Sequence, residues 1–237
     1  MPLRVGFDLD GTLADFASAF HDVEVRLYGP KSHIAAGQPE NEDEEPGATE
    51  DERRKRKDRR AKDAARHGRI RRDAIWAAIR STPDFWNTLQ PLDPTAVKRI
   101  MTMTLAHKWE VFFITQRPYT DGDTVQRQSQ RWLIDQGFDM PSVLVIGGSR
   151  GAAAAAMRLD YHIDDSPQNC IDVISDSKAR PILIVPDDDP AMTVKARKLG
   201  IGTAPDISAC LDILEQATLA KTQPNILQRI ATMVGWR

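Results

Sequence analysis

Two carboxylates lie two positions apart at the end of the first apolar run, in the segment FDLDGTLAD. Asp8 and Asp10 come where a short buried strand, residues 3–7, is expected to give way to a loop. Gly11 lets the backbone approach a ligand closely, and free N–H groups around Gly11 and Thr12 can bind a phosphate. Two hard oxygen ligands beside such a pocket suit Mg²⁺. A plainer interpretation is an Asx turn that caps a helix, but the full string at the first strand of an α/β chain favours function.

A hydroxyl ends the next expected strand, residues 110–114, in the segment FFITQRP. The Thr115 hydroxyl can donate to a phosphoryl oxygen, although a threonine in this position is also a common turn former. Gln116 and Arg117 follow, and we expect them at the edge of the same pocket. For Arg117 two interpretations stay open: a contact with substrate phosphate, or an exposed structural arginine.

Two adjacent aspartates, Asp164 and Asp165, end a third apolar strand in the segment YHIDDSPQN. Two carboxylates at the end of a buried strand are costly without a cation to bind them, which favours a metal site. The alternative is an acidic turn at the start of a helix, which the following Ser-Pro would also suit. His162 lies inside the strand, and we expect it to be a packed core residue.

These segments resemble the motifs of the haloacid dehalogenase (HAD) superfamily of phosphatases. That family's first motif is DxDGT, and the match implies that Asp8 attacks phosphorus while Asp10 is the general acid/base. The main-chain carbonyl of Asp10 is also expected on the metal. Thr115 matches the second motif, whose hydroxyl binds the transferring phosphoryl group.

Two further matches complete the resemblance. Arg150, in GGSRGAAAAAMRLDYHIDD, matches the family's third motif, where Lys is commoner, and would neutralise phosphate charge. Asp164 and Asp165 match the acidic fourth motif, which completes the Mg²⁺ site with Asp8 and Asp10. Asp165 is favoured as the direct ligand, but the choice between the two stays open. The plainer interpretation of Arg150 is a solvated residue at the start of a helix.

The rhythm of helices and short apolar strands from Asp93 onward predicts an α/β fold with a doubly wound parallel sheet. In such sheets chemistry lies beyond the carboxyl ends of the strands, where the strand order reverses. Before Asp93 the sequence predicts a helix at 13–28. After it the sequence predicts helices at 94–107, 122–136, 150–158, 167–175, near 190–199, 206–217 and 224–234, and strands at 110–114, 142–146, 161–163 and 181–185.

A charged insert interrupts the chain after the first helix. Residues 29–52 contain eight acidic residues after Pro39, and residues 53–72 contain twelve Arg or Lys. We expect the insert 29–72 to be disordered, with a solvated helix as the alternative for its basic half. The predicted domains are a catalytic core, 1–15 and 90–237, and a small helical cap, 16–89, that contains the insert.

The bulk composition excludes several classes of protein. Hydrophobic residues make up 41% and charged residues 28%, and the net charge of −2 gives the whole chain no electrostatic affinity for nucleic acid. The basic arm 53–72 could still bind nucleic acid, but the neighbouring acidic residues would compete and no aromatics are interleaved for base stacking. Two lone cysteines, no signal segment and no membrane span predict a cytoplasmic protein without a membrane partner. The oligomeric state is not predictable.

The substrate class rests on a narrower resemblance. TPDFWNTLQPLDPTAV, before the second motif, is similar to a stretch of the 5′(3′)-deoxyribonucleotidases, as are SQRWLIDQGF and HIDDSP. Phe85 and Trp86 would then either stack on a base or pack in the core. The resemblance implies a Mg²⁺-dependent phosphomonoesterase acting on a nucleotide or similar small phosphate. The alternatives are a sugar phosphatase, a polynucleotide 3′-phosphatase, or a nucleic-acid-binding protein that uses 53–72.

Overall fold

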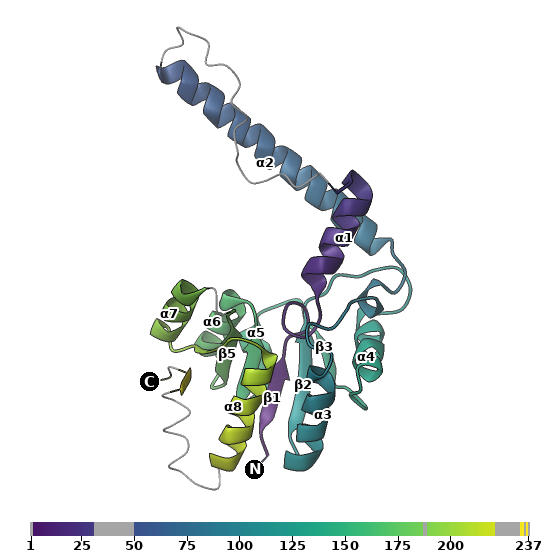
Figure 1. The fold of residues 1–237 in the computed structure, drawn as a ribbon, viewed down its shortest axis with the longest axis vertical. Coiled ribbons are helices and arrows are strands. Elements are labelled where there is room, and N and C mark those ends of the chain that lie inside the picture. Colours follow the sequence, from purple (N-terminus) through teal and green to yellow (C-terminus); the bar gives the residue numbers. More distant parts are fainter. Residues whose placement is uncertain (1, 31–49, 187–188, 221–232, 235, 237) are drawn as a thin grey trace.

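The computed structural model describes residues 2–30, 50–186, 189–220, 233–234 and 236, and its core is a parallel sheet (Figure 1). Six strands pair in the order β3-β2-β1-β4-β5-β6, and every pairing is parallel. The strands are β1 (Arg4–Phe7), β2 (Glu110–Thr115), β3 (Val143–Val145), β4 (Tyr161–Asp164), β5 (Arg180–Ile184) and β6 (Gly202–Ala204).

The order of the strands confirms the predicted doubly wound sheet. β1 lies between β2 and β4, so the direction of winding reverses at the boundary of β1 and β4. Open α/β sheets bind ligands at this point, outside the carboxyl ends of the strands. The register aligns Phe7 with Ile163 and with Phe113, so the residues that follow these three positions lie at the same edge of the sheet.

Helices cover both faces of the sheet, and neighbouring strand residues divide between them. On β2, Phe113 belongs to the largest apolar cluster, which includes α3 and α8, whereas Ile114 packs with residues of α5 and α6. The helices are α1 (Phe16–Tyr28), α2 (Glu50–Arg80), the 3₁₀ turn η1 (Phe85–Asn87), α3 (Ala96–His107), α4 (Val125–Asp135), α5 (Arg150–Ala156), α6 (Pro167–Asp176), α7 (Pro190–Lys198) and α8 (Ile207–Ala220).

The helical cap consists of α1 and α2, which pack together and extend away from the sheet (Figure 1). Arg71 of α2 ties the two helices: its Nε lies 3.0 Å from Glu24 and its guanidinium lies 4.4 Å from the Tyr28 ring centroid. η1 instead packs on α4 of the core. The predicted boundary of the cap at residue 89 stays a prediction.

The second half of the charged insert is helical, which corrects the expectation of disorder. Residues 50–72 belong to α2, because Arg, Lys and Ala are strong helix formers and no proline interrupts them. The many charged residues of this segment prevent it from being buried in a core, but they are compatible with a helix that is surrounded by water. Residues 31–49 lie outside the described part of the chain.

Most predicted elements are present, with shifts at their ends. α1 begins at Phe16 and not at Leu13, because the Asp15 side chain accepts a hydrogen bond from the Ser18 N–H (3.0 Å) and caps the helix. β6 was missed, since Gly-Thr-Ala has no large apolar residue to mark a strand. The predicted helix 224–234 lies outside the described residues except for 233–234. Among the described helices, none combines the length and the apolar character needed to cross a bilayer.

Candidate active site

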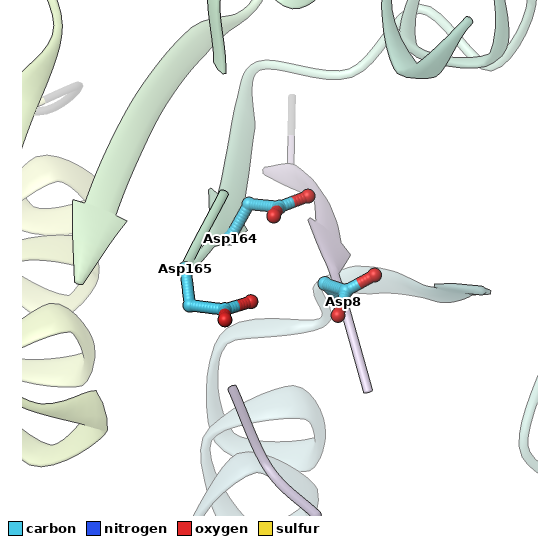
Figure 2. Close-up of side chains that lie close together, drawn as sticks. All are labelled: Asp8, Asp164 and Asp165. Atoms are coloured by element: carbon cyan, nitrogen blue, oxygen red, sulfur yellow. The ribbon is translucent and has the colours of Figure 1, made fainter. Parts of the chain in front are cut away.

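Three carboxylates meet where β1 and β4 end. Asp8 directly follows β1, Asp164 is the last residue of β4, and Asp165 comes next. The Asp8 N–H donates to the Ile163 carbonyl at 2.9 Å, which fixes the two strand ends side by side. One carboxylate oxygen from each aspartate lies within 4.8 Å of the others (Figure 2). The structure therefore brings together three of the four residues predicted to hold a metal.

Asp8 is buried, with only 5% of its surface exposed, and its carboxylate faces a cation. Arg150 Nη2 donates to Asp8 Oδ1. Burial raises the pKa of Asp8 well above its ordinary value, and the charge of Asp164 raises it further, while Arg150 opposes both. The ionised form of Asp8 consequently needs positive charge beyond that of one arginine.

Asp164 is fully buried and its carboxylate is saturated with donors. His162 Nε2 lies 2.9 Å from Oδ2, the Ser166 N–H donates to Oδ1 at 2.9 Å, and Asn169 Nδ2 lies 3.1 Å from both oxygens. Burial alone would raise the pKa of Asp164, but the hydrogen bond and charge of His162, with the Ser166 N–H and Arg150, lower it overall. His162 is buried in the core, as expected, and also anchors this carboxylate.

Asp165 is the accessible member of the group. Its Oδ1 accepts from Thr12 Oγ1 at 3.4 Å. Desolvation, followed by the charge of Asp164, raises the pKa of Asp165 to about 6. Gly11 packs against it: a Cβ there would lie 2.1 Å from Asp165 Oδ2, and the φ of Gly11 is +85°. The backbone at Gly11 was expected to approach a ligand closely. In the structure it approaches the Asp165 carboxylate.

The donor set fits a divalent cation. Three carboxylates supply the hard oxygen ligands that Mg²⁺ and Ca²⁺ prefer. Like charges this close raise each other's pKa, and the pKa values of Asp8 and Asp165 are both raised. A cation among them would remove that cost, so the residues present suit a metal site, although carboxylates alone do not select the ion.

Arg150 contacts two of the three carboxylates. It is the first residue of α5, whose N-cap is Ser149, and it is buried. Its Nε lies 3.6 Å from Asp164 Oδ2, so the guanidinium bridges Asp8 and Asp164. Nη1 is buried and donates no hydrogen bond within the described part of the chain. The expected alternative of a solvated arginine is wrong.

Asp10 lies apart from the three carboxylates and pairs with Arg117. Arg117 Nε donates to both Asp10 oxygens (3.1 and 2.9 Å), and Nη2 donates to Oδ1 at 2.7 Å. Arg117 Nη1 donates to Ser129 Oγ at 2.9 Å, and the guanidinium lies 4.9 Å from the Trp86 ring centroid. All three nitrogens have partners within the chain and the side chain is fully buried, so the interpretation of Arg117 as an exposed arginine is wrong.

The remaining predicted phosphate ligands line the strand ends. Thr12 and Thr115 are buried, Thr115 as the last residue of β2, while Gln116 is exposed. Sequence reasoning missed two features: the pairing of Arg117 with Asp10, and the anchoring of Asp164 by Asn169. The second had a signal, because Asn169 lies in the first turn of α6, close after the two aspartates.

The structure resembles solved structures of other proteins over most of its length. One is a putative β-phosphoglucomutase from Thermotoga maritima, with 16% identity, a TM-score of 0.50, and coverage of 90% of this chain and 99% of that one. Another is a HAD family hydrolase from Deinococcus radiodurans R1 with bound phosphate and sodium, with 13% identity, a TM-score of 0.52, and coverage of 93% and 96%. No family model and no curated protein matches the sequence. The fold is therefore that of HAD hydrolases, with an acidic group at the strand ends.

Proposed function

We propose that this chain is a Mg²⁺-dependent phosphomonoesterase that acts through an aspartyl-phosphate on Asp8, with nucleotides as its substrates. The observation that carries the proposal is the position of Asp8. It lies at the end of β1, at the reversal of the strand order, in contact with Arg150 and beside the carboxylates of Asp164 and Asp165. A Deinococcus radiodurans hydrolase of the same fold binds phosphate, which supports the choice of ligand.

The first half-reaction transfers the phosphoryl group to Asp8. A carboxylate oxygen of Asp8 attacks phosphorus, the bond to the ester oxygen breaks, and Asp10 gives that oxygen its proton. Arg150 Nη1, which donates to no described residue, would bind a phosphoryl oxygen while Nη2 donates to Asp8. Buried donors of this kind stabilise the charge that spreads over the phosphoryl oxygens in the transition state.

The second half-reaction releases phosphate from Asp8. Asp10, now a carboxylate, takes a proton from water, the oxygen attacks phosphorus, and the bond from phosphorus to the Asp8 oxygen breaks. Arg117 orients Asp10 for both steps by gripping its carboxylate with two nitrogens. Asp10 therefore accepts its catalytic proton in competition with Arg117, and the carboxyl must loosen from this pair when it is protonated.

Mg²⁺ would be held by the carboxylates of Asp8 and Asp165 and by the main-chain carbonyl of Asp10. Asp164 would support this site from its buried position. Bound there, the ion would neutralise phosphoryl oxygens and let Asp8 ionise beside two other carboxylates. Thr115, Thr12, Gly11 and Gln116 would complete the phosphate pocket through hydroxyl, backbone and amide donors.

A group of aromatic rings beside the site supports a nucleotide substrate. Phe16 stacks on Trp76 (5.5 Å between ring centroids) and contacts Trp86 (5.7 Å), and Phe20 contacts Trp76 (5.7 Å). Trp86 touches Arg117, so this group is linked to Asp10. Phe85 and Trp86 are themselves buried and cannot stack on a base. The half-buried rings of Phe16, Phe20 and Trp76 are the surface that would bind one.

Phosphate release from the full chain tests the proposal. The panel contains deoxynucleoside 5′- and 3′-monophosphates, sugar phosphates, a 3′-phosphorylated oligonucleotide and an aryl phosphate, each with Mg²⁺ and with chelator. Asp8→Asn serves as the matched inactive control. We expect Mg²⁺-dependent turnover that Asp8→Asn abolishes, with the highest kcat/KM on a deoxynucleotide.

Two outcomes would contradict different parts of the proposal. No Mg²⁺-dependent release from any phosphate would remove the phosphatase assignment. Release from sugar phosphates that exceeds release from nucleotides would leave the chemistry in place and refute the role of the aromatic group. Replacing Trp76 with Leu should raise KM for nucleotides and leave KM for a sugar phosphate, which has no aromatic ring to stack, within about twofold, since stacking on one ring contributes about 1–3 kcal/mol.

A further inference from the structure

The part of α2 farthest from the sheet carries a row of cations on one side. Arg59, Lys62, Arg66 and Arg69 follow at i, i+3, i+7 and i+10, a spacing that places side chains along one face of an α-helix. All four are exposed, and none is ion-paired with another described residue. We call these four residues the cationic row.

The cationic row lies on a length of helix that has no packing partner within the described chain. The buried residues of α2, Ile75 and Ile79, belong to its last two turns, and α2 packs on α1 near that end. From 57 to 67 every described side chain is exposed, and α2 projects into solvent (Figure 1). Helices without tertiary contacts are marginal in water. A ligand that binds the cationic row would therefore also stabilise this half of α2.

The residues around the cationic row select among possible partners. An interfacial membrane helix needs an apolar face, and Ile70 is the one large aliphatic residue between 57 and 72. Three of the four cations are arginines, whose planar guanidinium binds phosphate with two parallel hydrogen bonds. No aromatic residue lies between 57 and 72, so bases cannot be stacked there. These residues favour a ligand recognised by its phosphates alone.

Most of the acidic residues that precede the cationic row on α2 do not occupy its turns. Glu50, Asp51 and Glu52 form the first turn of α2, where the helix dipole favours negative charge, and the cationic row begins about two turns later. Between 57 and 72 the acidic residues are Asp58 and Asp63, against eight arginines and lysines. The positive charge is therefore concentrated on the part of α2 that projects into solvent.

We propose that the cationic row of α2 binds the phosphate backbone of a nucleic acid without regard to its sequence. The row spans ten residues, about 15 Å at 1.5 Å per residue. A duplex carries one charge per about 1.7 Å of its axis, so this length can offer a phosphate to each of the four cations. The binding is independent of the phosphatase chemistry, because α2 holds none of the proposed catalytic residues.

Anisotropy of a labelled 20-mer, single-stranded and duplex, titrated with the full chain tests the proposal. Four released counterions predict a slope of log K against log salt of about −3 for the single strand and about −4 for the duplex. Binding of the single strand should then weaken by about 50-fold between 50 and 200 mM salt. Changing the cationic row to glutamine (Arg59→Gln, Lys62→Gln, Arg66→Gln, Arg69→Gln) should abolish this binding.

The matched control removes four exposed lysines elsewhere: Lys98→Gln, Lys108→Gln, Lys195→Gln and Lys198→Gln. This variant has the same net charge and should keep the affinity and the slope of the parent. Circular dichroism and turnover of the aryl phosphate establish that both variants are folded, and a chain without phosphatase activity can still bind the oligonucleotide. Equal loss in both variants, no binding by the parent, or polyglutamate binding as tightly as the oligonucleotide would each overturn the proposal.

Discussion

Replacing Arg117 with methionine tests its pairing with Asp10, which the sequence did not predict. The substitution keeps most of the apolar volume beside Trp86 and removes the guanidinium from Asp10 and Ser129. Removing one partner of a fully buried ion pair costs about 3–5 kcal/mol, but the Asp10 side chain is 23% exposed and water can partly replace the lost donors. The lost contact with Trp86 adds about 1 kcal/mol. We therefore expect Arg117→Met to lower the free energy of unfolding by about 2–4 kcal/mol.

The matched control is Arg127→Met on α4. Arg127 also pairs with an aspartate, Asp123, at 2.8 Å, but its side chain is 68% exposed. An exposed pair of this kind contributes at most about 1 kcal/mol. Urea unfolding of both variants gives the comparison, and equal destabilisation would refute the argument from burial.

The same variant has a kinetic signature. Freed from Arg117, Asp10 keeps its carboxylate and loses its orientation, so part of the roughly 10²–10⁴-fold contribution of a general acid should disappear. We expect kcat on an alkyl phosphate to fall by about 10–100-fold, with a smaller loss on an aryl phosphate and little change in KM. Arg117→Lys should not restore the rate, because an ammonium cannot grip both carboxylate oxygens. A raised KM with unchanged kcat would instead identify Arg117 as a substrate ligand.

Three further predictions concern the aspartates. Asp8→Asn should fold as the parent does and lose phosphate release, and turnover within tenfold of the parent would exclude the aspartyl-phosphate. Asp10→Asn should slow alkyl phosphates more than aryl phosphates, which need less help from an acid, and equal losses would argue against Asp10 as that acid. In chelator, the raised pKa of Asp165, about 6 against an ordinary 3.8, means that the folded chain binds the proton more tightly than the unfolded one. Stability should therefore rise as the pH falls from 7 to 5, and urea unfolding of Asp165→Asn should lack this component.

The fold could be predicted because its signals are local. Short apolar runs such as Val111–Ile114, alternating with helical segments, specify a parallel sheet, and parallel strands place their carboxyl ends at one edge. That geometry alone brings Asp8, Asp164 and Asp165 together across more than 150 residues. β6 was not predicted, because Gly-Thr-Ala has little strand propensity of its own. It is a strand at the edge of the sheet because it pairs with β5.

The side-chain pairings could not be predicted, because they depend on packing between distant segments. Arg117 and Asp10 are separated by 107 positions, and neither residue carries a sequence signal that predicts the other as its partner. Their pairing depends on Trp86, which lies in a third segment and closes the arginine off from water. Composition likewise could not separate a disordered basic tract from a solvated helix, since both are rich in charge and poor in apolar residues.

The roles of Asp164 and Asp165 illustrate what the structure adds to an acidic pair. The sequence resemblance favours Asp165 as the direct ligand but leaves the choice between the two open. In the structure, Asp164 is surrounded by His162, Ser166, Asn169 and Arg150, which hold its charge and use both of its oxygens. The Asp165 carboxylate accepts from Thr12 at 3.4 Å and from its own backbone N–H, and it is exposed. A carboxylate already saturated by donors has little left to offer an ion, so we propose Asp165 as the direct ligand of the metal, while Asp164 fixes Arg150 in position against Asp8.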